Sequence, residues 1–278
     1  MRTGMNLLLW TTHVSDAHAP LLAELAAAGF DGVEVPIFEG DAAHFRSVRS
    51  ELDRAGLACT TVSVAAPDAN AVSPDPEVRA AFVERMRWAI EMSQILGSEV
   101  LCGPLHQALG EFTGNGATAD EQAVAAEALH AAAELAEEAG VTIALEYLNR
   151  FECYFLNTAV AARALVEAVG HPRLRTMYDT FHAHIEEKSQ AEAIRTVAPV
   201  LAHFHVSEND RGVPGTGQVR FDEAFATLHE IGYDGWITIE AFGSALPDLA
   251  AATKVWRPLF ARESDVYGEG LALIKRLW

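Results

Sequence analysis

One short pattern recurs along the chain: a helix-like stretch ends in glycine, and a run of β-branched or other apolar residues follows within a few positions. Glycine directly after a helix adopts the left-handed conformation without a Cβ clash, so it is a typical end signal for a helix. The glycines in this position are Gly29, Gly56, Gly97, Gly140, Gly170 and Gly232. The repeat therefore predicts short buried strands that alternate with helices.

Eight apolar runs result when an opening run and one run after Pro199 are added. They cover residues 5–10, 33–35, 60–64, 100–102, 141–145, 174–178, 202–206 and 236–239. Strands that alternate with helices pair in parallel, and eight such units in 278 residues fit one closed barrel. We predict an α/β fold, a single-domain (β/α)8 TIM barrel over residues 1–278, with the last ~25 residues as a C-terminal extension.

Two of the intervening helices carry clear start signals. Asp75-Pro76 is an N-cap followed by proline, and it predicts a helix over 76–96. Thr118 and Glu121 have the spacing of a capping box before a helix over 119–139. The alternative fold is an open doubly wound sheet, which we disfavour because no GxGxxG motif follows the first strand and no linker divides the chain.

The charge balance limits the partners. The chain has 20 Lys and Arg against 39 Asp and Glu, a formal net charge of −19. Such a surface repels phosphate backbones and anionic lipids, so we expect neither a nucleic-acid nor a membrane partner. No apolar run reaches the ~18 residues of a membrane span, and we expect no signal peptide, because the first residues lack its apolar segment. Cys59, Cys102 and Cys153 are odd in number and widely spaced, which favours a cytoplasmic protein.

Four polar residues stand at the ends of the last four apolar runs: Glu146, Asp179, His205 and Glu240. They are 33, 26 and 35 residues apart, so a closed barrel brings them together at the C-terminal ends of adjacent strands, where barrel enzymes have their active sites. Three bare carboxylates would repel one another, and a divalent cation removes that repulsion. Three oxygens and one imidazole suit Mn2+, Mg2+ or Co2+ better than structural zinc, although the ligands alone do not decide the metal.

Three other features have more than one interpretation. Glu34 ends a short apolar run, and a supporting or structural role is as reasonable for it as contact with a substrate. The glycine-rich stretch 212–217 is either a phosphate-binding loop or, as we favour, a loop that positions Arg211. We expect His203 to face away from His205 by strand alternation and to pack between sheet and helices.

The residues around the proposed ligands form a specific combination. It comprises Glu146 with Asn149-Arg150-Phe151-Glu152, Asp179-Thr180-Phe181-His182 with Ile185-Glu186-Glu187, His205-x-x-Glu208-x-x-Arg211, Glu240 after an apolar strand, and Trp256-Arg257. This combination resembles the ketose 3-epimerases, the D-tagatose, D-allulose and L-ribulose 3-epimerase group of the xylose-isomerase-like barrels. The resemblance spans essentially the whole chain and is most specific from residue 146 to residue 240.

The resemblance implies metal-dependent epimerisation of free ketoses at C3 through a cis-enediolate. Glu146, Asp179, His205 and Glu240 match the ligands of the family's single divalent metal. Mn2+ is the expected ion, with Co2+ and Mg2+ as alternatives. Glu146 and Glu240 also match the family's acid/base pair.

The resemblance also implies how the sugar is held. Glu152, His182 and Arg211 match the residues that bind its O1 and O2 end. Trp10 and His106 stand at or just beyond strand ends, where they can line the pocket around the sugar tail. A homodimer or homotetramer is expected from the resemblance.

Other functions use related sites. An aldose–ketose isomerase, or a lyase or dehydratase on a keto-sugar or cyclitol, would use the same metal site. The related apurinic-site nuclease needs further His and Asp ligands and a basic surface, which the charge of −19 disfavours. A non-catalytic sugar- or metal-binding module would have no reason to keep Glu152, His182 and Arg211 beside the ligands.

Overall fold

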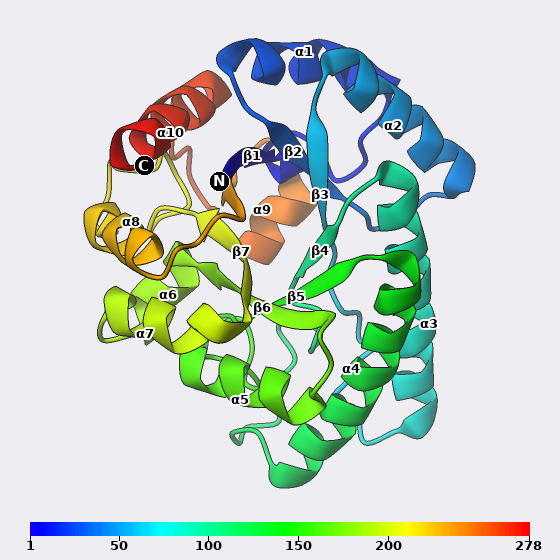
Figure 1. Ribbon diagram of the computed structural model, residues 1–278. Coiled ribbons are helices and arrows are strands. Elements are labelled where there is room, and N and C mark those ends of the chain that lie inside the picture. The colour runs from blue at the N-terminus through cyan, green and yellow to red at the C-terminus, as the bar shows by residue number, and fades with distance from the viewer.

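Eight parallel strands close into a barrel in which β1 is hydrogen-bonded to β8, and this confirms the predicted TIM barrel and excludes the open sheet. The computed structural model describes all residues 1–278, and Figure 1 shows the helices around the strands. The strands are β1 (Arg2–Asn6), β2 (Gly32–Pro36), β3 (Ala58–Val62), β4 (Val100–Gly103), β5 (Thr142–Glu146), β6 (Leu174–Asp179), β7 (Leu201–Val206) and β8 (Trp236–Ile239).

Ten α-helices and three short 3-10 helices connect and cover the strands. They are α1 (Ala19–Ala28), α2 (Ala42–Ala55), α3 (Pro76–Leu96), α4 (Ala119–Ala139), α5 (Ala159–Val169), α6 (Thr180–Glu186), α7 (Gln190–Val197), α8 (Phe221–Glu230), α9 (Pro247–Thr253) and α10 (Glu263–Leu277), with η1 (Leu7–Leu9), η2 (Asp16–His18) and η3 (Ala198–Val200). No helix has the length and apolar composition needed to cross a membrane.

The local signals for helix ends act as predicted. Asp75 accepts a hydrogen bond from the backbone of Glu77 at the start of α3, and Thr118 and Glu121 form the capping box of α4. Five of the glycines are left-handed C-caps, and the sixth, Gly232, has a φ of 67° one residue beyond the cap of α8. These signals act locally, so the sequence alone suffices to predict them.

The prediction for the first strand is wrong in its extent. The strand ends at Asn6 instead of Trp10, and residues 7–9 form η1. The Asn6 side chain accepts a hydrogen bond from the Leu8 amide at 2.8 Å and so turns the backbone out of the strand. The three leucines of η1 are buried as well, and for this reason the apolar run in the sequence extends beyond the end of the strand.

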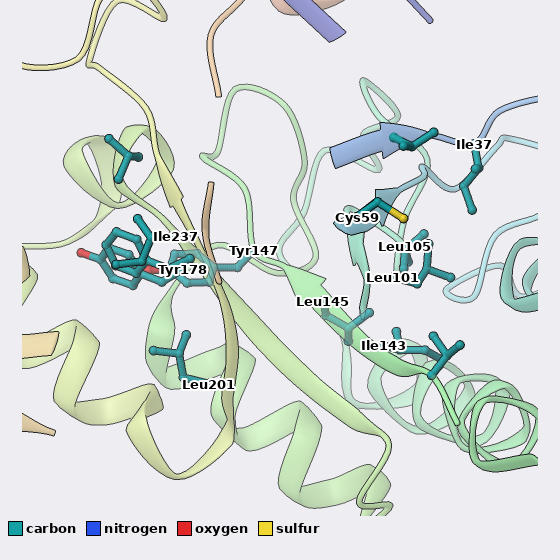
Figure 2. Packing of buried hydrophobic residues seen from close by; sticks show 14 of the residues in the cluster. Ile37, Cys59, Leu101, Leu105, Ile143, Leu145, Tyr147, Tyr178, Leu201 and Ile237 are labelled. Atoms are coloured by element: carbon teal, nitrogen blue, oxygen red, sulfur yellow. The ribbon is translucent and has the colours of Figure 1, made fainter. Parts of the chain in front are cut away.

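Strand alternation separates two cores. A cluster of 66 buried residues fills the space between strands and helices, and a cluster of 10 includes side chains inside the barrel. On β5, Ile143 and Leu145 belong to the outer core, as Figure 2 shows, whereas Ala144 belongs to the inner one. Glu146 comes two residues after Ala144 and therefore faces the barrel interior.

The prediction that His203 faces away from His205 is wrong. The Nε2 atom of His203 lies 2.8 Å from Oε2 of the buried Glu34, and the two histidine rings are 5.0 Å apart. Side chains two residues apart on a strand share a face, so both histidines point into the barrel. His203 therefore belongs to the polar interior, below the C-terminal end of the strands.

The last two helices have different positions. α10 contacts both β8 and α8, and its Tyr267 donates a hydrogen bond to Glu24 of α1, so α10 covers the barrel between α8 and α1. α9, drawn in orange in Figure 1, follows β8 and contributes side chains to the cavity at the strand ends. The C-terminal extension expected from the sequence remains a prediction.

The close approach of strands at Gly32 leads to a stability prediction. A Cβ atom added to Gly32 would lie 2.4 Å from the carbonyl oxygen of Ala58 and 2.6 Å from the ring of Trp236. We expect Gly32→Ala to lower the free energy of unfolding by about 1–3 kcal/mol, because a packed barrel interior relaxes poorly. Gly268→Ala is the matched control: this exposed position in α10 has no atom within 4 Å, and alanine there should stabilise the helix by about 0.5–1 kcal/mol. Equal denaturant midpoints for the two variants would contradict the prediction.

Candidate metal centre and active site

The ends of the last four strands bring the four predicted ligands together. Glu146 and Asp179 are the last residues of β5 and β6, and Asp179 pairs in register with His205 of β7. Glu240 follows β8, and its amide donates to the carbonyl of Val206 at 3.1 Å. All four are buried, and one ligand atom of each lies within 4.8 Å of the others.

The atoms of this cluster fit a divalent cation. Oε1 of Glu146 and Nδ1 of His205 are buried and have no hydrogen-bond partner. Asp179 uses Oδ1 to accept hydrogen bonds from the first turn of α6, which leaves Oδ2 directed to the cluster, 3.5 Å from His205 Nδ1. Buried polar atoms without partners are costly, and a cation coordinated by three carboxylates and one imidazole satisfies them.

The protonation of the cluster follows from its crowding. Burial and the neighbouring carboxylates of Glu240 and Asp179 raise the pKa of Glu146 well above its usual value. Burial acts to lower the pKa of His205, but Glu34 and Glu240 outweigh it and hold this pKa well above the usual value. Burial acts to raise the pKa of Asp179, but Arg211 keeps it below the usual range. Without a cation, Glu146 and His205 therefore keep their protons to a higher pH than isolated side chains do.

Arg211 supplies a fixed positive charge beside the cluster. Its Nη1 atom lies 2.6 Å from Oε2 of Glu240 and 3.4 Å from Oδ2 of Asp179. The guanidinium carbon lies 3.7 Å from the ring centre of Phe181 and 5.0 Å from that of Phe242. The backbone of Arg211 has a φ of 67°, a conformation that residues other than glycine rarely adopt. Stacking and ion pairs together hold the guanidinium at the rim.

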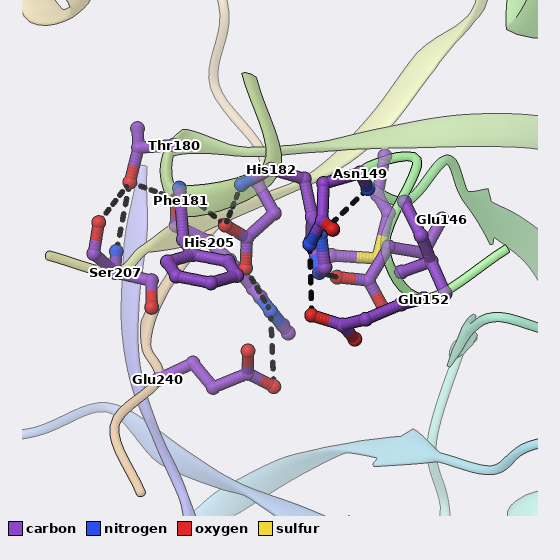
Figure 3. Close-up of polar contacts among 12 residues, drawn as sticks. Glu146, Asn149, Glu152, Thr180, Phe181, His182, His205, Ser207 and Glu240 are labelled. Atoms are coloured by element: carbon purple, nitrogen blue, oxygen red, sulfur yellow. Dashed lines mark hydrogen bonds and ion pairs between the residues drawn. The ribbon is translucent and has the colours of Figure 1, made fainter. Parts of the chain in front are cut away.

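His182 acts as a neutral donor in the same cavity. Its Nδ1 atom accepts the Asn149 amide at 3.0 Å, which places the ring proton on Nε2. Burial and Arg211 lower the pKa of His182 to about 3. Nε2 lies 3.5 Å from Oε1 of Glu146 and 3.0 Å from Nη2 of Arg211, so the imidazole and the guanidinium border the same region. Figure 3 shows Glu152 next to Asn149, which donates to it at 2.8 Å.

The cavity beside the cluster has a volume of about 90 Å³ and is lined by residues of two kinds. Its polar and charged lining residues are Glu146, Glu152, His182, Arg211 and Glu240. The rest of the lining is almost entirely apolar and includes Val62, Pro104, Leu109, Phe242, Leu249 and Ala252. Such a cavity can bind a ligand by hydrogen bonds and by apolar contact together.

Two residues predicted to line the substrate tail lie elsewhere. Trp10 packs near Tyr267 of α10, with ring centres 6.3 Å apart, and is not among the cavity-lining residues. His106 is fully buried, and its Nε2 lies 2.9 Å from the carbonyl oxygen of Glu146. Burial lowers its pKa to about 4, so the neutral ring donates to this carbonyl and supports the backbone of a ligand.

The stretch 212–217 encloses a carboxylate of the protein itself. Glu208 accepts hydrogen bonds from the amides of Gly215 at 2.8 Å and of Gln218 and Val219 at 3.0 Å. A Cβ atom on Gly217 would lie 2.6 Å from this carboxylate, so only glycine fits there. Three amides in this stretch and directly after it therefore already bind an anionic group, and the loop supports the rim that carries Arg211.

Two residues that contact the site were assigned no role from the sequence. Asn6 donates to Oε1 of Glu34 at 2.9 Å and to Oε1 of Glu240 at 3.2 Å. Asn149 connects His182 with Glu152. The signal for Asn6 was a polar residue inside the first apolar run, and the signal for Asn149 was its place three residues after a ligand.

Comparisons of the sequence and of the structure with known proteins point to the same family. A model of xylose isomerase-like TIM barrels matches residues 22–277. The chain is 33% identical to the ketose 3-epimerase of Arthrobacter globiformis, over 99% of this chain and 96% of that protein. It is 32% identical to the L-ribulose 3-epimerase of Methylomonas sp. (strain DH-1), over 98% and 96% of the two chains. The crystal structure of D-allulose 3-epimerase from Methylomonas sp. with D-allulose superposes with a TM-score of 0.94 at 31% identity, covering 100% of this chain and 97% of that one.

The raised pKa values in the ligand cluster lead to a prediction of how metal binding depends on pH. Glu146 and His205 have raised pKa values in the absence of a cation, and both must lose a proton to coordinate one. Mn2+ should therefore bind more tightly as the pH rises from 6 to 8, by about tenfold per pH unit for each proton released. Titration calorimetry in buffers with different ionisation enthalpies measures the number of protons. An affinity that does not change with pH would show that these groups are already deprotonated.

Proposed function

This chain belongs to the xylose isomerase-like TIM barrel family and, within it, to the ketose 3-epimerases, and we propose that it inverts C3 of a free ketose with the help of one divalent metal ion. One observation carries the proposal: four metal-ligand residues at neighbouring strand ends border a cavity that Glu146, Glu240 and the hydrogen-bond donors His182 and Arg211 line. A cation, a pair of carboxylates and hydrogen-bond donors can together remove a proton next to a carbonyl and stabilise the charge that develops.

The metal ion would be held by Glu146, Asp179, His205 and Glu240. We propose Mn2+, with Co2+ or Mg2+ as alternatives, because carboxylate oxygens dominate the ligand set and no thiolate is included. When bound, the cation supplies positive charge that polarises the ketose carbonyl and stabilises the negative charge that develops on deprotonation.

Arg211, His182 and Glu152 are proposed to hold the end of the sugar that carries O1 and O2. The Nη2 atom of Arg211 lies 3.0 Å from the Nε2 atom of His182, so the two side chains reach the same part of the cavity and can bind neighbouring sugar oxygens. Glu152 lines the same cavity and accepts a sugar hydroxyl. The donors also stabilise the oxygen that becomes negative as the enediolate forms.

Glu146 and Glu240 are the proposed proton carriers. They come from β5 and from the end of β8, so their carboxylates approach a sugar from different sides. One carboxylate takes the proton from C3, and the electron pair left behind becomes part of the cis-enediolate. The other carries a proton on the oxygen that does not bind the cation and donates this proton to the opposite face of C3, which inverts that centre. Exchange with water returns the pair to its initial protonation.

A free ketose fits this site better than a phosphorylated one. Apart from the charged residues near the ligands, the cavity lining offers mainly apolar groups and no lysine or second arginine. The one nearby loop with clustered backbone amides donates them to Glu208. The net charge of −19 also disfavours an anionic substrate.

The reaction is tested with D-fructose, D-tagatose and L-ribulose in heavy water and Mn2+-loaded protein. We expect the C3 epimer with one deuterium at C3, because the second glutamate delivers a solvent-derived proton there. An aldose product with deuterium on the carbon next to its aldehyde would indicate an isomerase. Loss of water from the sugar, or its cleavage, would indicate a dehydratase or a lyase. A sample treated with EDTA should be inactive until Mn2+ or Co2+ is added, and activity that survives exhaustive chelation would refute metal dependence.

The acid/base role of Glu240 is tested by Glu240→Gln. The amide cannot exchange protons, so kcat should fall by at least about 10²–10⁴-fold while the protein still binds Mn2+, although more weakly. Glu230→Gln, an exposed change on α8 that removes an ion pair with Arg195, is the control and should keep full activity. Near-normal turnover of the first variant would refute the role of Glu240 in proton transfer.

We further propose a cytoplasmic homodimer or homotetramer. All three cysteines are buried and unpaired, which supports a reducing compartment. Phe112, Phe151 and Trp256 are each more than half exposed, and exposed aromatic side chains support contact between subunits.

A further inference from the structure

A buried carboxylate lies inside the barrel directly beside the candidate metal centre. Glu34 is in the middle of β2 and is fully inaccessible to solvent. Five potential donors on four other strands surround its two oxygens: Asn6, Thr60, Cys102, His203 and His205. An ionised carboxylate in a barrel interior is tolerated only when its oxygens are satisfied in this way.

The contacts divide between the two oxygens of Glu34. Oε1 lies 2.8 Å from Nε2 of His205 and accepts from Asn6 at 2.9 Å. Oε2 lies 2.8 Å from Nε2 of His203 and accepts from Thr60 at 2.9 Å and from Cys102 at 3.1 Å. Both oxygens are used, so this cluster is a hydrogen-bonded network and has no free carboxylate atom for a second cation.

The contact with His205 determines which nitrogen of this ring is available to a metal. Nε2 is 2.8 Å from Oε1 of Glu34, so this carboxylate attracts the ring proton to Nε2. When a cation takes the place of the second ring proton, Nδ1 supplies the lone pair, and it lies 3.5 Å from Oδ2 of Asp179 and 3.5 Å from Oε1 of Glu240. A metal-binding histidine whose other nitrogen donates to a carboxylate has a fixed ring orientation and is a more basic ligand.

Glu34 also restrains a second ligand. The Asn6 amide group donates to Oε1 of Glu34 and, at 3.2 Å, to Oε1 of Glu240. Two of the four candidate ligands, on different strands, are thus connected to one buried carboxylate. Glu146 and Asp179 have no contact with it and are oriented from the opposite side, by His182 and by the first turn of α6.

We propose that Glu34 is a positioning residue of the metal centre, which holds His205 with Nδ1 directed to the ion and fixes Glu240 through Asn6. The inference rests on the proposed metal-dependent function, and it adds a residue that touches neither ion nor sugar. A purely structural role, in which Glu34 only stabilises the barrel interior, is the competing interpretation.

The test measures metal binding without sugar in Glu34→Gln and Thr60→Val. Glutamine has the same shape but no charge, so the Kd for Mn2+, measured by titration calorimetry, should rise by about 10- to 100-fold. Thr60→Val also removes a hydrogen bond to Glu34, but on the oxygen away from His205, so its Kd should stay close to that of the wild type. Visible absorption of the Co2+-loaded proteins, which reports ligand geometry, should change only in Glu34→Gln.

Equal Mn2+ affinities for wild type and a folded Glu34→Gln would overturn the inference, whatever happens to thermal stability. Equal losses of affinity in both variants would overturn it as well, because they would indicate a general effect on the barrel. If Glu34→Gln does not fold, Glu34→Asp takes its place: it keeps the charge but withdraws the carboxylate from His205, and its affinity should be reduced. A wild type that binds Mn2+ but does not epimerise ketoses would instead refute the proposed function and leave the inference on Glu34 standing.

Discussion

The mutual repulsion of Glu146, Asp179 and Glu240 is the interaction on which the C-terminal end of this barrel depends. Barrel closure and strand register force three carboxylates to within 4.8 Å of one another and of His205. Water cannot screen these charges because all of them are buried. The surrounding structure therefore supplies positive charge and directed donors, with Arg211 held between two aromatic rings and His182 held by a backbone amide.

The site has its supports on two sides. From inside the barrel, Glu34 contacts His205 and shares Asn6 with Glu240. From outside, the loop after β7 folds around Glu208 and carries Arg211. The metal-ligand side chains thus extend from the strand ends, whereas the fixed positive charge comes from Arg211 in the loop after β7.

Much of this could be predicted from the sequence because the signals are local or periodic. The glycine caps, the capping box of Thr118 and the strand-end positions of the four ligands follow from spacing alone. The extent of β1 could not be predicted, since the turn depends on which donor the Asn6 side chain meets. The partners of Glu34 and Glu208 depend on register between distant strands and on loop closure. The error at His203 differs in kind, because the period of a strand already places it on the same face as His205.

The loop around Glu208 has a consequence for altering the specificity of this enzyme. Proteins that recognise phosphomonoesters commonly do so with a nest of main-chain N–H groups, and this chain has such a nest next to its reaction site. In this chain the carboxylate of Glu208 occupies the place that a phosphate would take, and Glu208 lies just after β7. A redesign toward phosphorylated sugars would first have to replace Glu208 with a residue that leaves these N–H groups free. That change would also loosen the segment that carries Arg211.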